Sequence, residues 1–185
     1  MNNYPCRKSH RLKNYNYSSN GSYFITICIK NKECLLGDII VGVDALIDPI
    51  ISAKPDNIND LIYQKATNAE MILSSYGEII KNYIERGKSS YETLTVDNYV
   101  IMPNHIHLIL SISFEEEMVS KDLQHALIPK YVRTLKTLIT KEIGFSMFQR
   151  DYYDHIIRDE KEYEKIWNYI DTNVSNWMSD RFYMY

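Results

Sequence analysis

The chain has 185 residues, of which 45% are hydrophobic, so it has enough apolar material for one domain with a real core. It lacks both an uninterrupted apolar run of about eighteen residues and the apolar stretch of a signal peptide, so we expect a cytoplasmic protein with no membrane partner. The three cysteines show no CxxC spacing, which argues against a disulfide framework or a zinc knuckle.

The net charge of −3 is divided unevenly along the chain. Residues 1–32 carry lysines and arginines but no acids, whereas residues 33–70 contain seven acids and two lysines. We therefore expect a single domain over residues 1–185, with a basic N-terminal arm over about residues 1–20. Taken alone, this pattern favours a solvated tail followed by an acidic loop.

The first half of the chain predicts one strand, an insertion and one helix. Residues 23–30 (YFITICIK) are β-branched and aromatic, which predicts a strand. Residues 38–69 have no clear period and are interpreted as an irregular insertion. From residue 69 to residue 86 the apolar positions fall near helical spacing, and Gly87 offers a stop signal, so a helix is expected there.

The second half predicts a hairpin, a helix, a strand and a last helix. Residues 91–102 and 105–113 are expected to be strands joined by a tight turn at Pro103 and Asn104. A helix is expected over residues 121–143, kinked or divided at Pro129. A strand over residues 148–157 and a helix over residues 160–177 complete the chain.

This order of elements predicts an α+β fold. Strand, helix, strand, strand, helix, strand and helix form a ferredoxin-like split βαβ arrangement, in which helices pack on an antiparallel sheet. An extra C-terminal helix follows it, and this helix carries Tyr169.

The stretch NYVIMPNHIHLIL, residues 98–110, places two histidines in an apolar strand. His105 and His107 are two residues apart, so they share one face of the strand, while Ile106 and Leu108 point to the other. Two neutral imidazoles could form part of a site for a transition metal. A bare pair of this kind is more often simply hydrogen-bonded on a solvated face. We expect one face of the strand to be buried and the histidine face to be open.

The last helix offers a candidate partner for the histidines. Tyr169 and Asn173 are four residues apart and lie on one flank of its apolar stripe, so they can face the same partner. Tyr169 is weak evidence by itself, because the chain has 16 tyrosines. Other candidates for a third ligand are His10, His125 and His155, of which His155 is interpreted as a structural hydrogen-bonding residue.

Three blocks resemble one known family. VIMPNHIHLIL, FQRDYYDHIIRDEKEYEKIWNYIDTN and RKSHRLKNYNYSSNGSYFITICIKNKECLLGD are similar to the motifs of HUH-type single-tyrosine transposases, in particular the REP-associated tyrosine transposase branch. The blocks cover the beginning, middle and end of the chain. They leave about residues 40–90 and 114–146 weakly supported.

The resemblance implies an enzyme that nicks and rejoins single-stranded DNA through a 5′-phosphotyrosine. It assigns His105 and His107 as metal ligands, Tyr169 as the nucleophile and Asn173 as a third ligand, with Mg²⁺ or Mn²⁺ as the metal. Family members commonly carry Asn-Pro where this chain has Asn173-Val174. Two alternatives stay open: a catalytically silent relative that binds hairpin DNA, and a small metalloenzyme unrelated to DNA.

The implied partner is single-stranded or hairpin DNA, bound by a monomer or a homodimer. Basic side chains could follow its phosphates. The candidates are Arg7, Lys8, Arg11 and Lys13 in the arm, Arg150 and Arg158 beside the last strand, and Arg133, Lys136 and Lys141 on the second helix.

Overall fold

The computed structural model describes residues 20–41, 69–88, 91–113 and 127–183. The predicted basic arm, residues 42–68 of the predicted insertion and residues 121–126 of the second predicted helix lie outside the described residues. The elements are β1 (Gly21–Cys28), the short 3-10 helix η1 (Lys30–Lys32), β2 (Gly37–Val41), β3 (Ala69–Leu73), α2 (Ser75–Gly87), β4 (Leu94–Met102), β5 (His105–Ile112), α3 (Leu127–Ile143), β6 (Tyr153–Ile157), α4 (Glu160–Thr172) and the 3-10 helix η4 (Trp177–Ser179).

The central sheet has the strand order β4-β5-β1-β6, and every neighbouring pair is antiparallel. β1 and β4 therefore run parallel with β5 between them, and β5 and β6 run parallel with β1 between them. These are two interlocked split βαβ units. The predicted α+β class with a ferredoxin-like antiparallel sheet is confirmed.

The predicted hairpin is also present. β4 and β5 are joined by a turn at Pro103 and Asn104, and β5 then pairs with β1 along its whole length. In this register Thr26 of β1 lies opposite His107. His105 and His107 thus stand on an inner strand, hydrogen-bonded on both sides, which fixes the positions of their Cα atoms.

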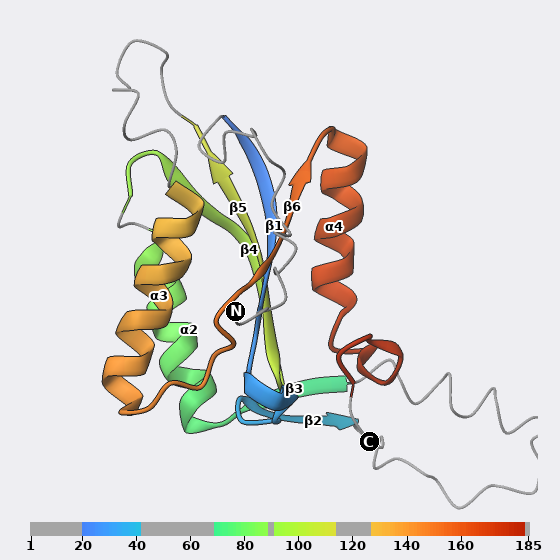
Figure 1. Ribbon diagram of the computed structural model, residues 1–185. Helices are drawn as coiled ribbons and strands as arrows, with labels where there is room; N and C mark the ends of the chain where they lie inside the picture. The colour runs from blue at the N-terminus through green and yellow to red at the C-terminus, as the bar shows by residue number, and fades with distance from the viewer. Residues whose placement is uncertain (1–19, 42–68, 89–90, 114–126, 184–185) are drawn as a thin grey trace, which may run out of the picture.

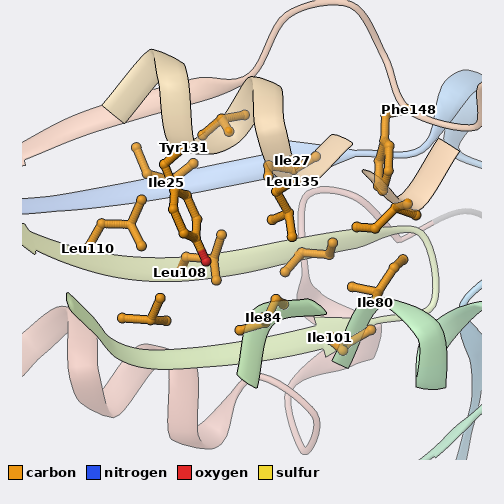
Figure 2. Packing of buried hydrophobic residues seen from close by; sticks show 14 of the residues in the cluster. Ile25, Ile27, Ile80, Ile84, Ile101, Leu108, Leu110, Tyr131, Leu135 and Phe148 are labelled. Atoms are coloured by element: carbon orange, nitrogen blue, oxygen red, sulfur yellow. The ribbon is translucent and has the colours of Figure 1, made fainter. Parts of the chain in front are cut away.

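One face of the sheet carries the larger core, under α2 and α3 (Figure 1). Alternate residues of β1 and β5 point to this face, as expected for extended strands. Each fully buried leucine or isoleucine contributes about 1.5–3 kcal/mol of transfer free energy. Figure 2 shows Ile25, Ile27, Leu108 and Leu110 of the sheet beside Ile80 and Ile84 of α2 and Tyr131 and Leu135 of α3.

The opposite face packs against α4 through a smaller cluster. Its buried members are Ile109, Ile157 and Ile170, with Phe24 and Trp167 among the half-buried residues around them. The two histidines share this face with Ile109, because alternate residues of β5 point the same way. The apolar contacts that dock α4 therefore also set the distance between α4 and the histidines.

Hydrogen bonds from β4 complete the docking of α4. A β-bulge lies between Val96 and Asn98. Beside it, Asp97 accepts a hydrogen bond of 3.0 Å from the hydroxyl of Tyr163, and Asn98 donates one of 2.9 Å to Asp171. α4 is thus tied to the sheet at two points along its length.

The prediction of a helix from residue 69 to residue 86 is wrong for its first part. Ala69–Leu73 is the strand β3, which pairs with β2, and its burial alternates residue by residue. The helix begins only at Ser75, because the Ser74 side chain caps it by accepting a hydrogen bond of 3.2 Å from the backbone N–H of Gly77. The ends of the predicted insertion are therefore paired strands.

The described part of α3 runs from Leu127 to Ile143, and Pro129 lies in the first turn of this part, where a missing N–H removes no hydrogen bond within it. The earlier residues of the predicted helix lie outside the described residues, so the predicted kink or division at Pro129 stays a prediction. Among the described helices, none combines the length and the apolar character that crossing a membrane requires.

The predicted strand over residues 148–157 is shorter in the structure. β6 begins at Tyr153, and Phe148 makes only an isolated bridge with Ile29. The ammonium group of Lys136 donates hydrogen bonds to the carbonyls of residues 149, 150 and 151, at 3.0, 3.4 and 3.1 Å. This segment therefore satisfies its carbonyls with a lysine rather than with a neighbouring strand. Lys136 therefore has partners within the protein, and its suggested contact with DNA stays a prediction.

We predict that Ile170→Ala destabilises the protein by about 2–5 kcal/mol, because it removes a side chain that is only 2% exposed from the small cluster under α4. Urea unfolding measures the effect. Leu138→Ala on α3, where the side chain is 41% exposed, is the matched control and should change the free energy of unfolding by less than about 1 kcal/mol. Equal effects of the two substitutions would show that α4 is not docked as described.

Candidate metal and tyrosine site

His105 and His107 form the centre of the candidate site. Their Nε2 atoms lie 3.0 Å apart, and the exposed fractions of the two residues are 0% and 1%. Two ring nitrogens this close, on neighbouring side chains of one strand face, can bind the same ion. The structure thus brings the predicted pair together.

The prediction that the histidine face is open is wrong. The chain after α4 folds back over this face, and the ring of Phe182 lies 4.5 Å from that of His105, measured between centroids. Trp177 lies 6.0 Å from the same ring, and Phe24 of β1 stacks on His107 at 4.9 Å. The sequence pattern places the histidines on one face but does not indicate that a distant aromatic segment covers it.

The Nδ1 atom of each imidazole has a hydrogen-bond partner. Asn104 Oδ1 lies 2.8 Å from Nδ1 of His105, and Thr26 Oγ1 lies 2.9 Å from Nδ1 of His107. Such partners fix the orientation of a metal-binding ring. Both Nε2 atoms are left facing the same space.

Burial is the main cause of the low pKa values of both histidines. It lowers the pKa of His105 to about 4; Asp180 opposes this, while Arg181 and Lys32 act in the same direction as burial. The pKa of His107 lies well below its usual value of 6.5 because of burial, the neighbouring His105 and Arg181. At neutral pH both imidazoles are therefore uncharged, which is the form that binds metal ions.

Tyr169 and Asn173 come from the end of α4, as predicted for residues one turn apart. The Tyr169 hydroxyl lies 3.3 Å from Nε2 of His107 and donates a hydrogen bond of 3.1 Å to Oδ2 of Asp180. Tyr169 is 39% exposed, so its hydroxyl is at the edge of the buried cluster. Burial and Asp180 raise the pKa of Tyr169, while a hydrogen bond from Asn173 lowers it.

Asn173 has an unsatisfied buried oxygen. The residue is 1% exposed, and its Nδ2 donates to Oδ2 of Asp180 at 3.4 Å. Its Oδ1 has no hydrogen-bond partner among the described residues. A buried carbonyl oxygen without a partner costs about 1–3 kcal/mol, and coordination of a cation would remove this cost. The amide therefore fits the ligand role that the resemblance assigns to it.

Asp180 is also part of the candidate site, although no sequence pattern predicted it. One ligand atom from each of His105, His107 and Asp180 lies within 4.8 Å of the other two. The other carboxylate oxygen, Oδ1, accepts a hydrogen bond of 2.6 Å from the backbone N–H of Phe182, which fixes its direction. Two imidazoles with carboxylate and amide oxygens suit Mn²⁺ or Zn²⁺ better than Mg²⁺, which prefers oxygen ligands alone. The described residues thus fit a divalent metal ion.

The last predicted helix ends earlier than expected, and the chain that follows it brings Asp180 close to the histidines. α4 ends at Thr172 with Asn173 as its C-cap, and the 3-10 helix η4 at Trp177–Ser179 turns the chain back to the histidines. The departure from Asn-Pro at Asn173-Val174 does not extend the helix. Asp180 has no helical spacing to Tyr169, so no periodic pattern could have revealed it.

The predicted DNA-binding residues are only partly described. Arg7, Lys8, Arg11 and Lys13 lie outside the described residues. Arg150 and Arg158 are exposed, and Arg158 lies two residues before α4, whose first residue is about 14 Å along the helix axis from Tyr169. Arg133 and Lys141 belong to α3, on the opposite face of the sheet.

Two basic side chains that we did not predict as DNA contacts lie beside the histidines. Arg181 stacks on Phe182 at 4.5 Å and on Tyr153 at 5.5 Å, and the Lys32 ammonium group lies 5.6 Å from the centre of the Phe182 ring. The predicted structural role of His155 agrees with its hydrogen bond of 2.8 Å to Glu162.

The inner strand of the antiparallel split βαβ sheet presents a histidine pair to a tyrosine on a following helix. This is the arrangement that the resemblance to HUH-type single-tyrosine transposases implies. In sequence, the chain is 36% identical to an uncharacterised protein of Haemophilus influenzae over 198 aligned residues, which cover 96% of this chain and 93% of that protein. The chain belongs to the same family as this Haemophilus protein. It matches no model of a described protein family.

Two similar solved structures are of proteins described as transposases. One is a REP-associated tyrosine transposase bound to a REP hairpin, 16% identical, with a TM-score of 0.49 over 88% of this chain and 71% of that chain. The other is a transposase candidate from Deinococcus radiodurans, 14% identical, with a TM-score of 0.33 over 87% of this chain and 96% of that chain.

We predict that the metal-free protein loses stability as the pH falls from about 6.5 towards 4. The pKa of His105 is lower in the folded state than in the unfolded state, so the unfolded state binds more protons in this window. The stabilisation is complete above about pH 6.5, and His105 alone accounts for a loss of roughly 3 kcal/mol.

Urea unfolding in EDTA at several pH values measures this loss. The slope of stability against pH over this window should be shallower in His105→Gln than in the wild-type protein. An identical slope would mean that His105 is not buried in its neutral form.

Proposed function

We propose that this protein is a metal-dependent DNA strand transferase that nicks and rejoins single-stranded DNA through Tyr169. The observation that carries the proposal is the position of the Tyr169 hydroxyl, 3.3 Å from Nε2 of His107 and at the open edge of a buried group of metal-ligating atoms. A nucleophile at the rim of a metal site can reach a phosphate whose oxygens face the metal.

The residues divide into those that hold the metal and those that act on the phosphate. His105, His107 and Asn173 are the proposed ligands, and Asp180 is a further candidate. A bound divalent cation would neutralise negative charge on the non-bridging oxygens of the scissile phosphate. The ion is proposed to be Mn²⁺ or Mg²⁺, and the two imidazoles favour Mn²⁺.

The reaction begins with a protonated phenol. Burial and the Asp180 carboxylate raise the pKa of Tyr169, and the phenolic proton lies in the hydrogen bond to Asp180 Oδ2. We expect Asp180 to accept this proton as the tyrosine oxygen attacks phosphorus. A bond forms between phosphorus and the tyrosine oxygen, and the bond to the 3′ oxygen breaks. That oxygen takes up a proton to become a 3′-hydroxyl.

The covalent product explains how the strand could be rejoined. The 5′-phosphotyrosine keeps the energy of the phosphodiester, so attack by a 3′-hydroxyl restores a DNA strand and releases Tyr169. The partner is proposed to be single-stranded DNA next to a hairpin; the REP-associated tyrosine transposase is bound to a REP hairpin. The residues of the basic arm, Arg150 and Arg158 remain candidate phosphate contacts.

We predict a denaturant-resistant adduct when the protein is incubated with Mn²⁺ and single-stranded DNA that contains a hairpin. Tyr169→Phe should abolish the adduct, because it removes the attacking oxygen. Tyr163→Phe on the same helix is the matched control and should retain it, since this hydroxyl contacts Asp97 instead. Denaturing gel electrophoresis with labelled DNA measures the adduct.

A second substitution tests the proton acceptor in the same assay. Asp180→Asn should slow adduct formation by roughly 100-fold or more, because an amide oxygen is a much weaker base.

Hairpin binding by the wild-type protein without an adduct, in Mn²⁺ and in Mg²⁺, would favour the catalytically silent alternative. Absence of DNA binding would contradict both the strand-transferase function and the function of a silent hairpin-binding relative.

We also predict that the metal binds without DNA. Asn173→Ala should weaken Mn²⁺ binding roughly tenfold or more, because it removes the orphaned oxygen from the site. Asn168→Ala, at an exposed position five residues earlier on α4, is the control and should leave the affinity unchanged. Electron paramagnetic resonance of free Mn²⁺ measures the affinity, and equal affinities would exclude Asn173 as a ligand.

A further inference from the structure

Asn104 connects three segments of the chain at the back of the histidine pair. It is 1% exposed, and its Nδ2 donates hydrogen bonds to two backbone carbonyls, those of Lys32 at 3.2 Å and Phe182 at 2.9 Å. A carbonyl can only accept, so the nitrogen of the amide must face these two groups. The orientation of the Asn104 side chain is therefore determined.

This orientation decides which nitrogen of His105 carries a hydrogen. The Asn104 Oδ1 atom faces Nδ1 of His105 at 2.8 Å, and an amide oxygen can only accept. Nδ1 of His105 must therefore be the donor. In the neutral ring, Nε2 of His105 is left as a bare lone pair, which is the form that binds a metal ion.

His107 has the opposite arrangement in the absence of a metal. Its Nε2 faces the bare Nε2 of His105 at 3.0 Å and the Tyr169 hydroxyl oxygen at 3.3 Å, and the hydroxyl proton is donated to Asp180. Both neighbours are acceptors, so Nε2 of His107 carries the hydrogen. Its Nδ1 then accepts from the Thr26 hydroxyl at 2.9 Å.

We propose that Asn104 and Thr26 are positioning residues with different tasks at the metal site, an inference that rests on the proposed function. Asn104 holds His105 permanently in the metal-binding tautomer, because its amide oxygen cannot donate. Thr26 lets His107 change tautomer, because a hydroxyl can both donate and accept. If Nε2 of His107 were to bind a metal, the ring hydrogen would have to be on Nδ1, where it would be donated in a hydrogen bond to the Thr26 oxygen. The ring keeps one proton throughout.

The wild-type protein tests this asymmetry directly by NMR of ¹⁵N-labelled histidines. The metal-free protein should show His105 with its hydrogen on Nδ1 and His107 with its hydrogen on Nε2. Addition of Zn²⁺, a diamagnetic probe, should move the hydrogen of His107 to Nδ1 and leave His105 unchanged. A hydrogen on Nε2 of His105, or on Nδ1 of metal-free His107, would overturn the proposal.

Substitutions separate the tautomer role of Asn104 from a purely structural one. Asn104→Ala should weaken Zn²⁺ binding by about 10–100-fold. Asn104→Asp can still accept from Nδ1 of His105 but cannot donate to the carbonyls of Lys32 and Phe182, so we expect it to keep the wild-type affinity within roughly threefold. Equal losses in the two variants would show that Asn104 acts only as a structural anchor.

Thr26 has its own matched pair of variants. Thr26→Val keeps the shape of the side chain and should weaken Zn²⁺ binding by about 10–100-fold, whereas Thr26→Ser should restore it. Ser22→Ala is the control, since it removes a hydroxyl from the same face of β1 that contacts Ser111 and not a histidine. An unchanged affinity in Thr26→Val would overturn the role of Thr26.

Failure of this inference can be told apart from failure of the proposed function. If the wild-type protein binds neither Zn²⁺ nor Mn²⁺ and forms no DNA adduct, the proposed function fails, and the inference fails with it. If it binds metal and forms the adduct, but the histidine hydrogens or the variant affinities differ from those expected, only the inference fails.

Discussion

The site depends on one constraint: two imidazoles taken out of water must have partners for four ring nitrogens. The two Nδ1 atoms have Asn104 and Thr26, and the two Nε2 atoms face each other. A buried polar atom without a partner is costly, so each of these contacts has to be supplied by the fold. The antiparallel pairing of β1 with β5 supplies Thr26, and the hairpin turn supplies Asn104. The segment after α4 covers the histidines with Trp177 and Phe182.

This constraint also explains why α4 and the chain after it are arranged as they are. α4 is held on the sheet by the small cluster around Ile109 and Ile170, and by polar contacts with β4. The chain then returns through η4, so that Phe182 lies over His105 and Asp180 reaches Tyr169. The segment that covers the histidines therefore also adds Asp180 to the candidate ligands.

The order of elements in the sheet could be predicted from the sequence because it depends on local patterns. Strand alternation, helical spacing and the Pro103-Asn104 turn act over a few residues, and together they predicted the topology of the central sheet. The errors arose where a distant group decides the local structure. Ala69–Leu73 becomes a strand because β2 pairs with it, and residues 149–151 are not a strand because Lys136 satisfies their carbonyls.

The residues of the candidate site also divide into those that local patterns predict and those that depend on distant parts of the chain. His105 and His107 share a face by strand geometry, and Tyr169 and Asn173 share a flank by helix geometry, so the sequence could pair them within each element. That the two elements meet was implied only by the resemblance to a known family. Asp180 lies in a segment without periodicity, and its contacts depend on how the chain turns after α4.

The pairing of β2 with β3 has a consequence for how the chain tolerates change. The register joins Gly37 to Leu73 and Val41 to Ala69, so the last residue of β2 and the first residue of β3 lie side by side on neighbouring strands, which are about 5 Å apart. The entropy of closing a loop with fixed ends grows slowly, by about 0.6 kcal/mol for each doubling of its length. A change in the number of residues between Val41 and Ala69 therefore costs little closure entropy as long as β2 and β3 stay paired, and the histidine site is built on a different sheet.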